Sequence, residues 1–435
     1  MPLPTRRLAL LAVAAALLLI ALRLSSAAAV ASTIAVVALA GVLDAFVGVN
    51  PRKIGVARTL PYTVSLFSTG TGSWQLANPS ARVAKLAWAD SLVGSLGVVP
   101  RRRHVAIAPR ATAAVDFTLA PRRRGRFTPD AIALRSTGPL GLGARQARIS
   151  VPGQLRVYPS FRSKAEAELR LRKARLLEIG LRSATGLGTG TEFDSLREYQ
   201  VDDDVRRIDW SATARAQRAI VRTYRAELNQ TVIAALDCGR SSAGKAGGVP
   251  RLDHYMDAVM ALTTIANGLG DKLGLVAFDH HVRATVPASR HAGQFGRVCE
   301  AMYDQFPELA ESDYRNAFSH ILARFPRRTM LVLFTEINEH LVEDYLLDAL
   351  ALVVRDHLVV VASVRDPDLN RWSTDTPTEA DLAYRKAAAF AALDSRARAV
   401  ARLRAVGATV IDAVPGELAP ALADAYLRAK SRGRL

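Results

Sequence analysis

The most restrictive feature of the sequence is a regular alternation of short apolar segments and longer amphipathic segments in its C-terminal half. The apolar segments predict strands at residues 231–237, 273–279, 282–287, 329–335, 357–364 and 408–413. The amphipathic segments predict helices at residues 251–269, 292–306, 313–325, 341–355, 378–405 and 416–430. Strands that are apolar throughout belong to a mostly parallel sheet with helices on both faces, here with one hairpin at residues 279–282. The fold class is therefore α/β and Rossmann-type over residues 229–435, and any ligand is expected beyond the carboxyl ends of the strands.

Residues 54–160 have a different pattern, with period-two alternation interrupted by glycine and proline. The strand-like segments lie at residues 59–67, 72–80, 81–90, 103–110, 112–121, 125–136 and 153–159. Many short strands separated by turn residues indicate a small, β-rich, sandwich-like domain.

Two apolar runs precede this domain, at residues 8–22 and 27–49. The second is long enough to cross a hydrocarbon core of roughly 30 Å, so residues 1–53 are expected to form a transmembrane helical hairpin. Basic residues flank both outer ends, which places both termini and the main domains in the cytoplasm. A signal peptide cleaved near residues 26–29 is the alternative. Asp44, inside the second run, is expected at the membrane interface without a functional role.

The charge and cysteine content fit a protein tethered to the inner side of a membrane. The formal net charge is +18, and many of the arginines lie in the β-rich segment. Lys and Arg close to a bilayer are attracted to anionic lipid headgroups, which favours lipid contact over nucleic acid as the role of this charge. Only two cysteines occur, Cys238 and Cys299, so a disulfide framework is excluded and a reducing compartment is favoured.

Residues 161–228 hold a charged linker followed by a block in which opposite charges and aromatic residues are mixed. The block includes Asp194, Arg197, Glu198, Tyr199, Asp203, Arg206, Arg207, Asp209, Trp210 and Arg215. Such a mixture indicates a folded segment held by arginine–carboxylate pairs, because charged tails are usually of one sign and poor in aromatics. Two interpretations stay open. In the first, residues 202–204 form turns or caps, the arginines at 206, 207 and 215 pair with carboxylates, and Trp210 packs against the sheet; in the second, part of the block is a docking surface.

Three phrases of the sequence resemble one family of bacterial proteins. They are PRRRGRFTPDAIALRSTGPLGLG at residues 121–143, EFDSLREYQVDDDVRRIDWSATAR at 192–215 and VIAALDCGRS at 232–241. The family carries domain of unknown function fifty-eight and is typically encoded beside MoxR-type AAA+ ATPases. The resemblance implies an inner-membrane hairpin, a β-rich segment and a von Willebrand factor A-like domain. It also implies a MoxR-type ATPase, and a second von Willebrand A protein, as partners.

The same resemblance suggests a degenerate magnesium site at the end of the first strand. Similar domains carry DxSxS there, and oxygen ligands of this kind suit Mg²⁺. Asp237 and Ser241 match that motif, Gly239 replaces its first serine, and Ser312 and Glu336 are the candidates for the remaining ligands. The alternative is a strand-end aspartate that caps the next element.

Other patterns in the chain argue against catalysis. The Asp279-His280-His281 triplet occurs in some metal phosphoesterases, but here it falls in a predicted tight turn without a second Asp/His set. The glycines at 186, 188 and 190 follow a helical stretch and precede an acidic one, so they are expected to form a loop and not a phosphate cradle. Together with the family resemblance, this leads us to expect an inner-membrane-anchored, non-enzymatic adaptor whose cytoplasmic von Willebrand A-like domain binds protein partners. The alternative is a divalent-metal-dependent hydrolase acting at the carboxyl edge of the sheet.

Overall fold

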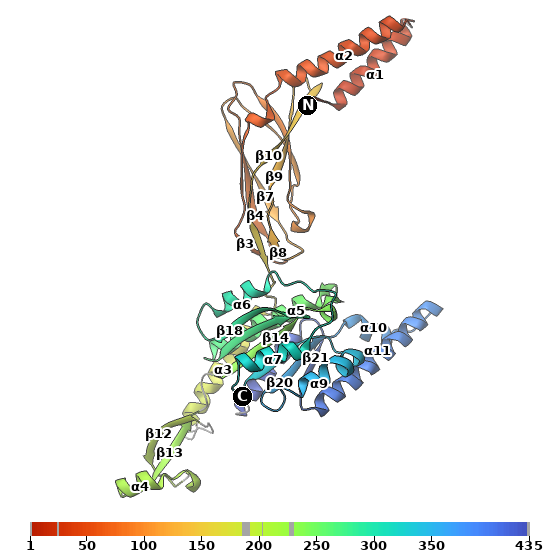
Figure 1. Cartoon of the computed structure of the whole chain (residues 1–435). Helices are drawn as coiled ribbons and strands as arrows, with labels where there is room; N and C mark the ends of the chain where they lie inside the picture. Colours follow the sequence, from red (N-terminus) through yellow and green to blue (C-terminus); the bar gives the residue numbers. More distant parts are fainter. Residues whose placement is uncertain (1, 24–25, 185–191, 202, 226–229, 433–435) are drawn as a thin grey trace. The chain divides into compact units, whose positions relative to one another are not determined.

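The computed structural model describes residues 2–23, 26–184, 192–201, 203–225 and 230–432. The chain divides into two compact units, Met1–Tyr158 and Pro159–Leu435, each with its own hydrophobic core (Figure 1). The glycine-rich stretch at residues 185–191 lies outside the described residues.

Two apolar helices open the first unit, α1 (Arg6–Ala21) and α2 (Ala27–Val47). At 1.5 Å per residue, α2 is about 31 Å long and α1 about 24 Å. Within the described residues, one helix is long and apolar enough to cross a membrane; its span is Ala27–Lys53 and its mean hydropathy is 2.2. Gly41 of α2 lies against Leu8 of α1, so the helices touch. The two-pass topology stays a prediction.

The rest of this unit is built from strands around one core, and its named strand pairs are antiparallel except β3–β11, which is parallel (Figure 1). Three sheets have the orders β1-β10-β9-β5-β6, β2-β4-β7 and β3-β11-β8. The strands are β1 (Pro2–Pro4), β2 (Gly55–Thr59), β3 (Thr63–Ser65), β4 (Gly70–Ala77), β5 (Ala84–Asp90), β6 (Arg102–Ile107), β7 (Thr112–Leu119), β8 (Gly125–Phe127), β9 (Ala131–Thr137), β10 (Gly143–Ser150) and β11 (Leu155–Tyr158). The buried rings of Trp74, Trp88 and Phe117 join β4, β5 and β7, and Trp74 Nε1 donates to Asp90 at 2.6 Å.

Strand β10 was not expected from the sequence. It reads GARQARIS, and its most deeply buried side chains are the small residues Ala144 and Ala147. The first residue of the strand, Gly143, has no room for a side chain, because a Cβ there would lie 1.9 Å from the carbonyl oxygen of Gly41 in α2. Because its inward-facing residues are small, β10 does not show the alternation of large apolar and polar residues by which strands are recognised in a sequence.

Asp44 has a structural role that was not predicted, while its expected position at a membrane interface stays a prediction. Its side chain is buried and accepts three backbone N–H groups of the turn between β9 and β10, from Leu140 (2.8 Å), Leu142 (2.7 Å) and Gly143 (3.0 Å). The hydroxyl of Thr5 donates to the carbonyls of Gly141 and Leu142 in the same turn. The carboxylate is therefore an acceptor that fixes the end of α2 to the β-rich part of the unit.

The second unit has an α/β fold with a mostly parallel sheet, as predicted. Its order is β18-β17-β14-β19-β20-β21, and only the β17–β18 pair is antiparallel within this sheet. The strands are β14 (Thr231–Asp237), β17 (Lys272–Phe278), β18 (Val282–Ser289), β19 (Met330–Phe334), β20 (Leu358–Val364) and β21 (Thr409–Ala413). β14 lies in the interior of the sheet, because β17 and β19 flank it on its two sides.

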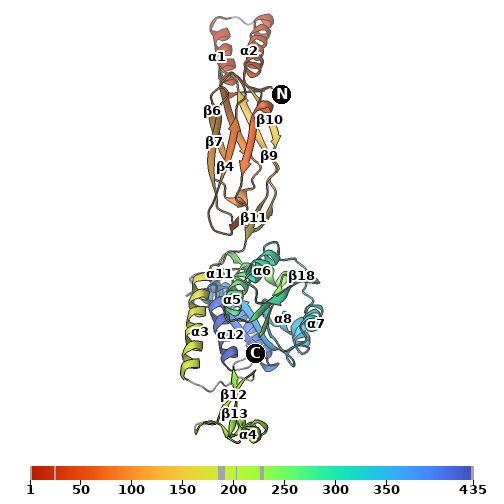
Figure 2. The same cartoon turned by 90° about the vertical axis from the view of Figure 1, so that its left-hand side faces the viewer.

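Helices cover both faces of this sheet. They are α3 (Lys164–Ala184), α5 (Arg251–Gly268), α6 (Gln294–Met302), α7 (Tyr314–Arg324), α8 (Glu339–Leu341), α9 (Leu347–Leu350), α10 (Pro367–Thr374), α11 (Ala380–Ala405) and α12 (Leu418–Ser431). α7, α9 and α11 share one core cluster with the sheet. α5 and α12 pack together against the opposite face, with α3 beside them (Figure 2).

Two helices differ from the prediction. The expected helix at residues 341–355 is divided into α8, a π-helical turn at Val342–Leu346 and α9. α10 was missed, although Pro367 at its first position and Asp366 as its N-cap are typical start signals. It is a short helix of 8 residues, too short to show a clear apolar periodicity.

The charged block folds into a small element of its own, which we call the signature arm (residues 192–225). β12 (Glu192–Glu198) and β13 (Ile220–Arg225) pair in antiparallel fashion with a bulge between Phe193 and Ser195. A 3-10 turn at Val205–Arg207 and helix α4 (Trp210–Ala216) lie between the two strands (Figure 1). The prediction of a folded segment is confirmed.

Candidate functional site

Asp237 ends the interior strand β14 at the carboxyl edge of the sheet and is completely buried. Three loops reach this residue: the one after β14, the one before α7 and the one after β19. Parallel strands bring such loops together, because their carboxyl ends meet at the same edge. The site at this edge consists of Asp237 and the side chains that these loops supply.

Five hydrogen-bond donors surround the Asp237 carboxylate. Oδ1 accepts from the backbone N of Gly239 at 2.8 Å and from Ser312 Oγ at 2.5 Å. Oδ2 accepts from the hydroxyls of Ser241 (2.6 Å), Tyr314 (2.8 Å) and Thr335 (2.5 Å). We call these residues the Asp237 hub. The sequence prediction included Ser241 and Ser312, which the structure brings to Asp237.

Thr335 and Tyr314 were missed by the sequence analysis. Thr335 directly follows β19, so its place at the carboxyl edge beside β14 could have been inferred from the strand order. Tyr314 is the first residue of α7, and its ring contributes to the core while its hydroxyl reaches Asp237. Burial raises the pKa of Tyr314 well above its usual range, and the Asp237 charge adds to that rise. The phenol therefore stays a neutral donor.

Gly239 has a physical reason to replace the serine of the resembled motif. A Cβ at this position would lie 2.0 Å from Ser312 Oγ and 3.0 Å from the carbonyl oxygen of Ala310. The Ser312 hydroxyl thus occupies the space that a side chain at 239 would need. Asp237 Oδ1 thus receives a hydroxyl from the loop before α7 and the backbone N–H of Gly239.

Glu336 belongs to a separate ionic cluster. Its Oε1 lies 2.5 Å from Arg396 Nη1, and its Oε2 lies 2.6 Å from Arg251 Nε. Arg396 also forms a fork on Asp412, at 2.8 and 2.9 Å. Burial raises the pKa of Glu336, whereas the two guanidinium charges oppose that rise.

This set of donors does not fit a magnesium ion as it lies. Mg²⁺ needs close to octahedral oxygen coordination, usually with one or two carboxylates. Here the hydroxyls donate to Asp237, so their protons already point at the only carboxylate of the hub. Glu336 is held by arginines. Magnesium binding at Asp237, Ser241, Ser312 and Glu336 stays a prediction.

Within the signature arm, acidic residues fix the backbone. Asp203 accepts from Arg197 through both oxygens, at 2.5 and 2.7 Å, and from the backbone N of Gln200 at 2.8 Å. Asp209 caps α4 by accepting from Ala212 N at 3.0 Å and also binds Arg222 at 2.9 Å. The pKa of Asp209 is lowered, first by the Ala212 N–H and then by Arg222.

The arginines of the arm only partly follow the prediction. The fork on a carboxylate comes from Arg197, whereas Arg215 donates to the carbonyl of Ser211 at 3.2 Å. Arg206 donates its backbone N–H to Asp204, and the charge of Arg207 helps to lower the pKa of Asp203 against the effect of burial. Glu198 pairs with Arg218, and Tyr199 bonds Ala219 through its backbone. The side chain of Asp194 lies outside the described part of the chain.

Trp210 corrects the expectation of a ring packed against the sheet. Its side chain is 72% exposed at the start of α4. Three apolar neighbours in the arm are exposed as well, Leu196 (46%), Val201 (93%) and Val205 (62%). The arm therefore presents apolar side chains on a backbone that its acidic residues hold in place.

Parts of the chain are similar to known proteins. Residues 195–374 match the family model described as "Protein of unknown function DUF58". The chain is 28% identical over 183 residues to uncharacterized proteins of Mycobacterium bovis and Mycobacterium tuberculosis. This alignment covers 41% of the chain and 56% of those relatives, so the chain spans little more than half of their length.

Two solved structures are similar to parts of this chain. The conserved hypothetical protein BatB from Bacteroides thetaiotaomicron is similar to 47% of this chain, over 99% of its own length, with 12% identity and a TM-score of 0.30. The vWF domain of the type V pili tip protein Mfa5 from Porphyromonas gingivalis is similar to 25% of the chain, over 38% of its length. Its identity is 11% and its TM-score 0.20.

Proposed function

Since residues 195–374 belong to the DUF58 family, we propose that this chain is a membrane-anchored, non-enzymatic adaptor that binds a protein partner through its signature arm. The observation that carries the proposal is the exposure of Trp210 on a preorganised backbone. Exposed tryptophan is costly to solvate and is enriched at the energetic centres of protein interfaces.

The amino-acid composition of the arm is also typical of a protein interface. Arg206, Arg207 and Arg215 lie in the same stretch as Trp210, and arginine is the other residue type favoured in interface hot spots. The Arg197–Asp203 fork and the Asp209 cap hold this stretch before any partner binds. Preorganisation of this kind reduces the entropy lost on association.

The carboxyl edge of the sheet supports the non-enzymatic part of the proposal. Catalysis by a carboxylate needs an oxygen that can take a proton or a metal from the reacting groups. Among the described residues of this edge, Asp237 is saturated by five donors and Glu336 is paired with two arginines. Both groups are arranged to stabilise the von Willebrand A-like fold that we assign to this domain.

The anchoring part of the proposal relies on α2 and on charge. α2 has the length and apolarity of a membrane span, and basic residues such as Arg52 and Lys53 follow it. Together with the net charge of +18, this favours a location at the cytoplasmic face of a bacterial inner membrane, in contact with anionic lipid.

A MoxR-type AAA+ ATPase is the partner class that the family resemblance implies, with a second von Willebrand A protein as a further member of the assembly. The test uses the full-length chain in nanodiscs containing anionic lipid and the purified MoxR-type ATPase of the same organism. Binding is measured by biolayer interferometry with ATP, with ADP and without nucleotide. We expect saturable binding that Trp210→Ala weakens about 30-fold, corresponding to a hot spot of about 2 kcal/mol.

Tyr384→Ala is the matched control, because Tyr384 is an aromatic residue of α11 that is 77% exposed and lies outside the arm. It should leave the affinity unchanged. If the wild-type chain does not bind the ATPase in any nucleotide state, the partner assignment is wrong. If Trp210→Ala binds as tightly as the wild type, the assignment of the arm as the docking surface is wrong.

A further inference from the structure

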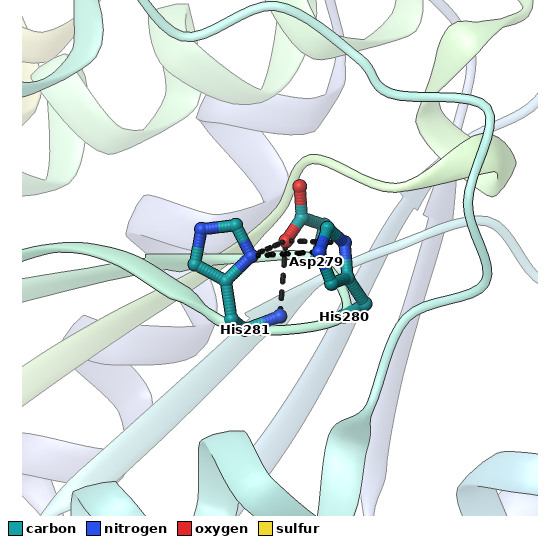
Figure 3. Close-up of side chains that lie close together, drawn as sticks. All are labelled: Asp279, His280 and His281. Carbon is teal, nitrogen blue, oxygen red and sulfur yellow. Dashed lines mark hydrogen bonds and ion pairs between the residues drawn. The ribbon is translucent and has the colours of Figure 1, made fainter.

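The turn between β17 and β18 brings three potential metal ligands together. Asp279, His280 and His281 occupy this turn, and their side chains converge (Figure 3). His281 Nδ1 lies 3.0 Å from Asp279 Oδ1, and His280 Nδ1 lies 3.3 Å from the same oxygen. The two imidazoles are also close to each other, with 3.1 Å between His281 Nδ1 and His280 Nε2.

The separations of 3.0 and 3.3 Å from Asp279 Oδ1 match those of ligands that share one metal ion, and the three ligand atoms all lie within 4.8 Å of one another. With metal–ligand bonds of about 2.0–2.2 Å, two ligands at angles between 90° and the tetrahedral value are about 3.0–3.5 Å apart. A set of two imidazole nitrogens and one carboxylate oxygen suits Zn²⁺ and its neighbours in the first transition row. It does not suit Mg²⁺ or Ca²⁺, which prefer oxygen ligands alone.

The carboxylate of Asp279 is held in position by its surroundings. Asp279 is fully buried, its Oδ1 accepts the backbone N–H of His281 at 3.0 Å, and its Oδ2 pairs with Arg283. Arg283 is itself fixed, because it donates to the carbonyl of Phe306 at 2.7 Å and pairs with Glu308. Outer contacts of this kind orient a ligand before the metal arrives.

The two imidazoles are accessible from solvent. The side chain of His280 is 52% exposed and that of His281 is 55% exposed. A metal held on the inner side by Asp279 would therefore keep an outward position for water or for a side chain of a bound protein. Among the described residues, this is the group of three or more His, Cys, Asp or Glu side chains close enough to hold a metal ion.

We propose that Asp279, His280 and His281 form a surface binding site for Zn²⁺ or a similar divalent transition metal. The proposal concerns binding and involves no catalytic step. The proposed site shares no residue with the Asp237 hub or with the signature arm, so the proposal does not depend on either of them.

The test measures Zn²⁺ binding to the untagged full-length chain by isothermal titration calorimetry. The visible absorption of bound Co²⁺ reports imidazole and carboxylate coordination in parallel. We expect one site per chain, and we expect His280→Ala and His281→Ala each to weaken Zn²⁺ binding at least about 10-fold. Both histidines are exposed, so these variants should fold normally.

Two controls locate the site. His340→Ala removes an imidazole that is 82% exposed and lies away from the turn, and Ser241→Ala removes a hydroxyl of the Asp237 hub. Neither should change Zn²⁺ affinity. The proposal is overturned if the wild type shows no saturable binding, or if the double variant His280→Ala/His281→Ala retains it. It is equally overturned if Ser241→Ala weakens binding and the histidine variants do not.

Discussion

The Asp237 hub and the signature arm use similar polar residues for opposite purposes. In the hub, four hydroxyls and one N–H converge on a buried carboxylate. In the arm, carboxylates bind arginines and N–H groups so that apolar side chains can face outward. The comparison teaches that a dense polar cluster at a favoured sheet edge can serve the fold, whereas the binding surface is expected where large apolar groups lack cover.

Asp237→Ala tests this distinction with the largest expected effect. It leaves four buried or half-buried hydroxyls without their acceptor, and we expect a loss of about 3–5 kcal/mol in the free energy of unfolding. Urea unfolding of the full chain in micelles, followed by far-UV circular dichroism, measures it. Ser241→Ala removes one donor and should cost about 1 kcal/mol. If Asp237→Ala keeps wild-type stability, the hub is not structural.

Gly239→Ser tests whether Ser312 has taken the place of a serine at 239. The new Cβ would meet Ser312 Oγ, so we expect a loss of about 1–3 kcal/mol in stability. The double variant Gly239→Ser/Ser312→Ala removes that contact and should recover part of the loss, which a double-mutant cycle quantifies. Strictly additive effects would show that the two positions do not compete for space.

Asp203→Ala should loosen the arm without unfolding the domain. It removes the acceptor of Arg197 and of the Gln200 N–H, and we expect a local loss of about 1–2 kcal/mol. Hydrogen exchange followed by mass spectrometry should show faster exchange in peptides from residues 195–223, while peptides from β14 and β17 stay protected. Uniform loss of protection in both regions would mean that the arm and the sheet unfold together.

Lowering the pH should also destabilise the arm, but less than Asp203→Ala does. The N–H of Ala212 and the guanidinium of Arg222 lower the pKa of Asp209 below its usual value, near 3.9 in unfolded chains. Its contribution to arm stability is therefore complete above the unfolded pKa and is lost as the pH falls through the folded pKa. Protection factors of the arm, corrected for intrinsic exchange, should fall as the pH is lowered below the unfolded pKa of about 3.9. Asp209→Asn should show a weaker pH dependence.

Trp210→Ala should have the smallest effect on stability. Because the ring is mostly exposed, we expect a change of less than about 0.5 kcal/mol in the free energy of unfolding. Urea unfolding under the conditions used for Asp237→Ala makes the two values directly comparable. A loss above 1.5 kcal/mol would show that Trp210 has a packing role, and the contrast between arm and hub would disappear.

Much of the second unit could be predicted because its signals are local. The predicted strand at 231–237 coincides with β14, and the predicted hairpin at 279–282 joins β17 and β18. Cys299 lies on the buried side of α6, which the apolar periodicity of the predicted helix at 292–306 indicates, and burial raises its thiol pKa to about 12. Strands, helices and turns of this kind are recognised from residues that are close together in the sequence, so their prediction does not require knowledge of distant contacts.

The site was less predictable because its contacts connect residues far apart in the chain. Asp237 and Ser241 were found through a motif, but Tyr314 and Thr335 reach Asp237 from separations of 77 and 98 residues. Similarly, nothing in the local sequence of Trp210 distinguishes an exposed ring from a packed one. The partners of Asp44 were missed for the same reason, because its three donors follow it by 96, 98 and 99 residues.

The position of Asp44 has a mechanical consequence. Its carboxylate joins the end of α2 to a turn in the β9–β10 hairpin through three hydrogen bonds, and the hairpin backbone approaches α2 so closely that a Cβ at Gly138 or Gly143 would clash with it. We therefore expect α2 and the β9–β10 hairpin to move together as one rigid body. If α2 crosses a membrane as we propose, a change in bilayer thickness that tilts α2 would also rotate the β-rich part of the same unit.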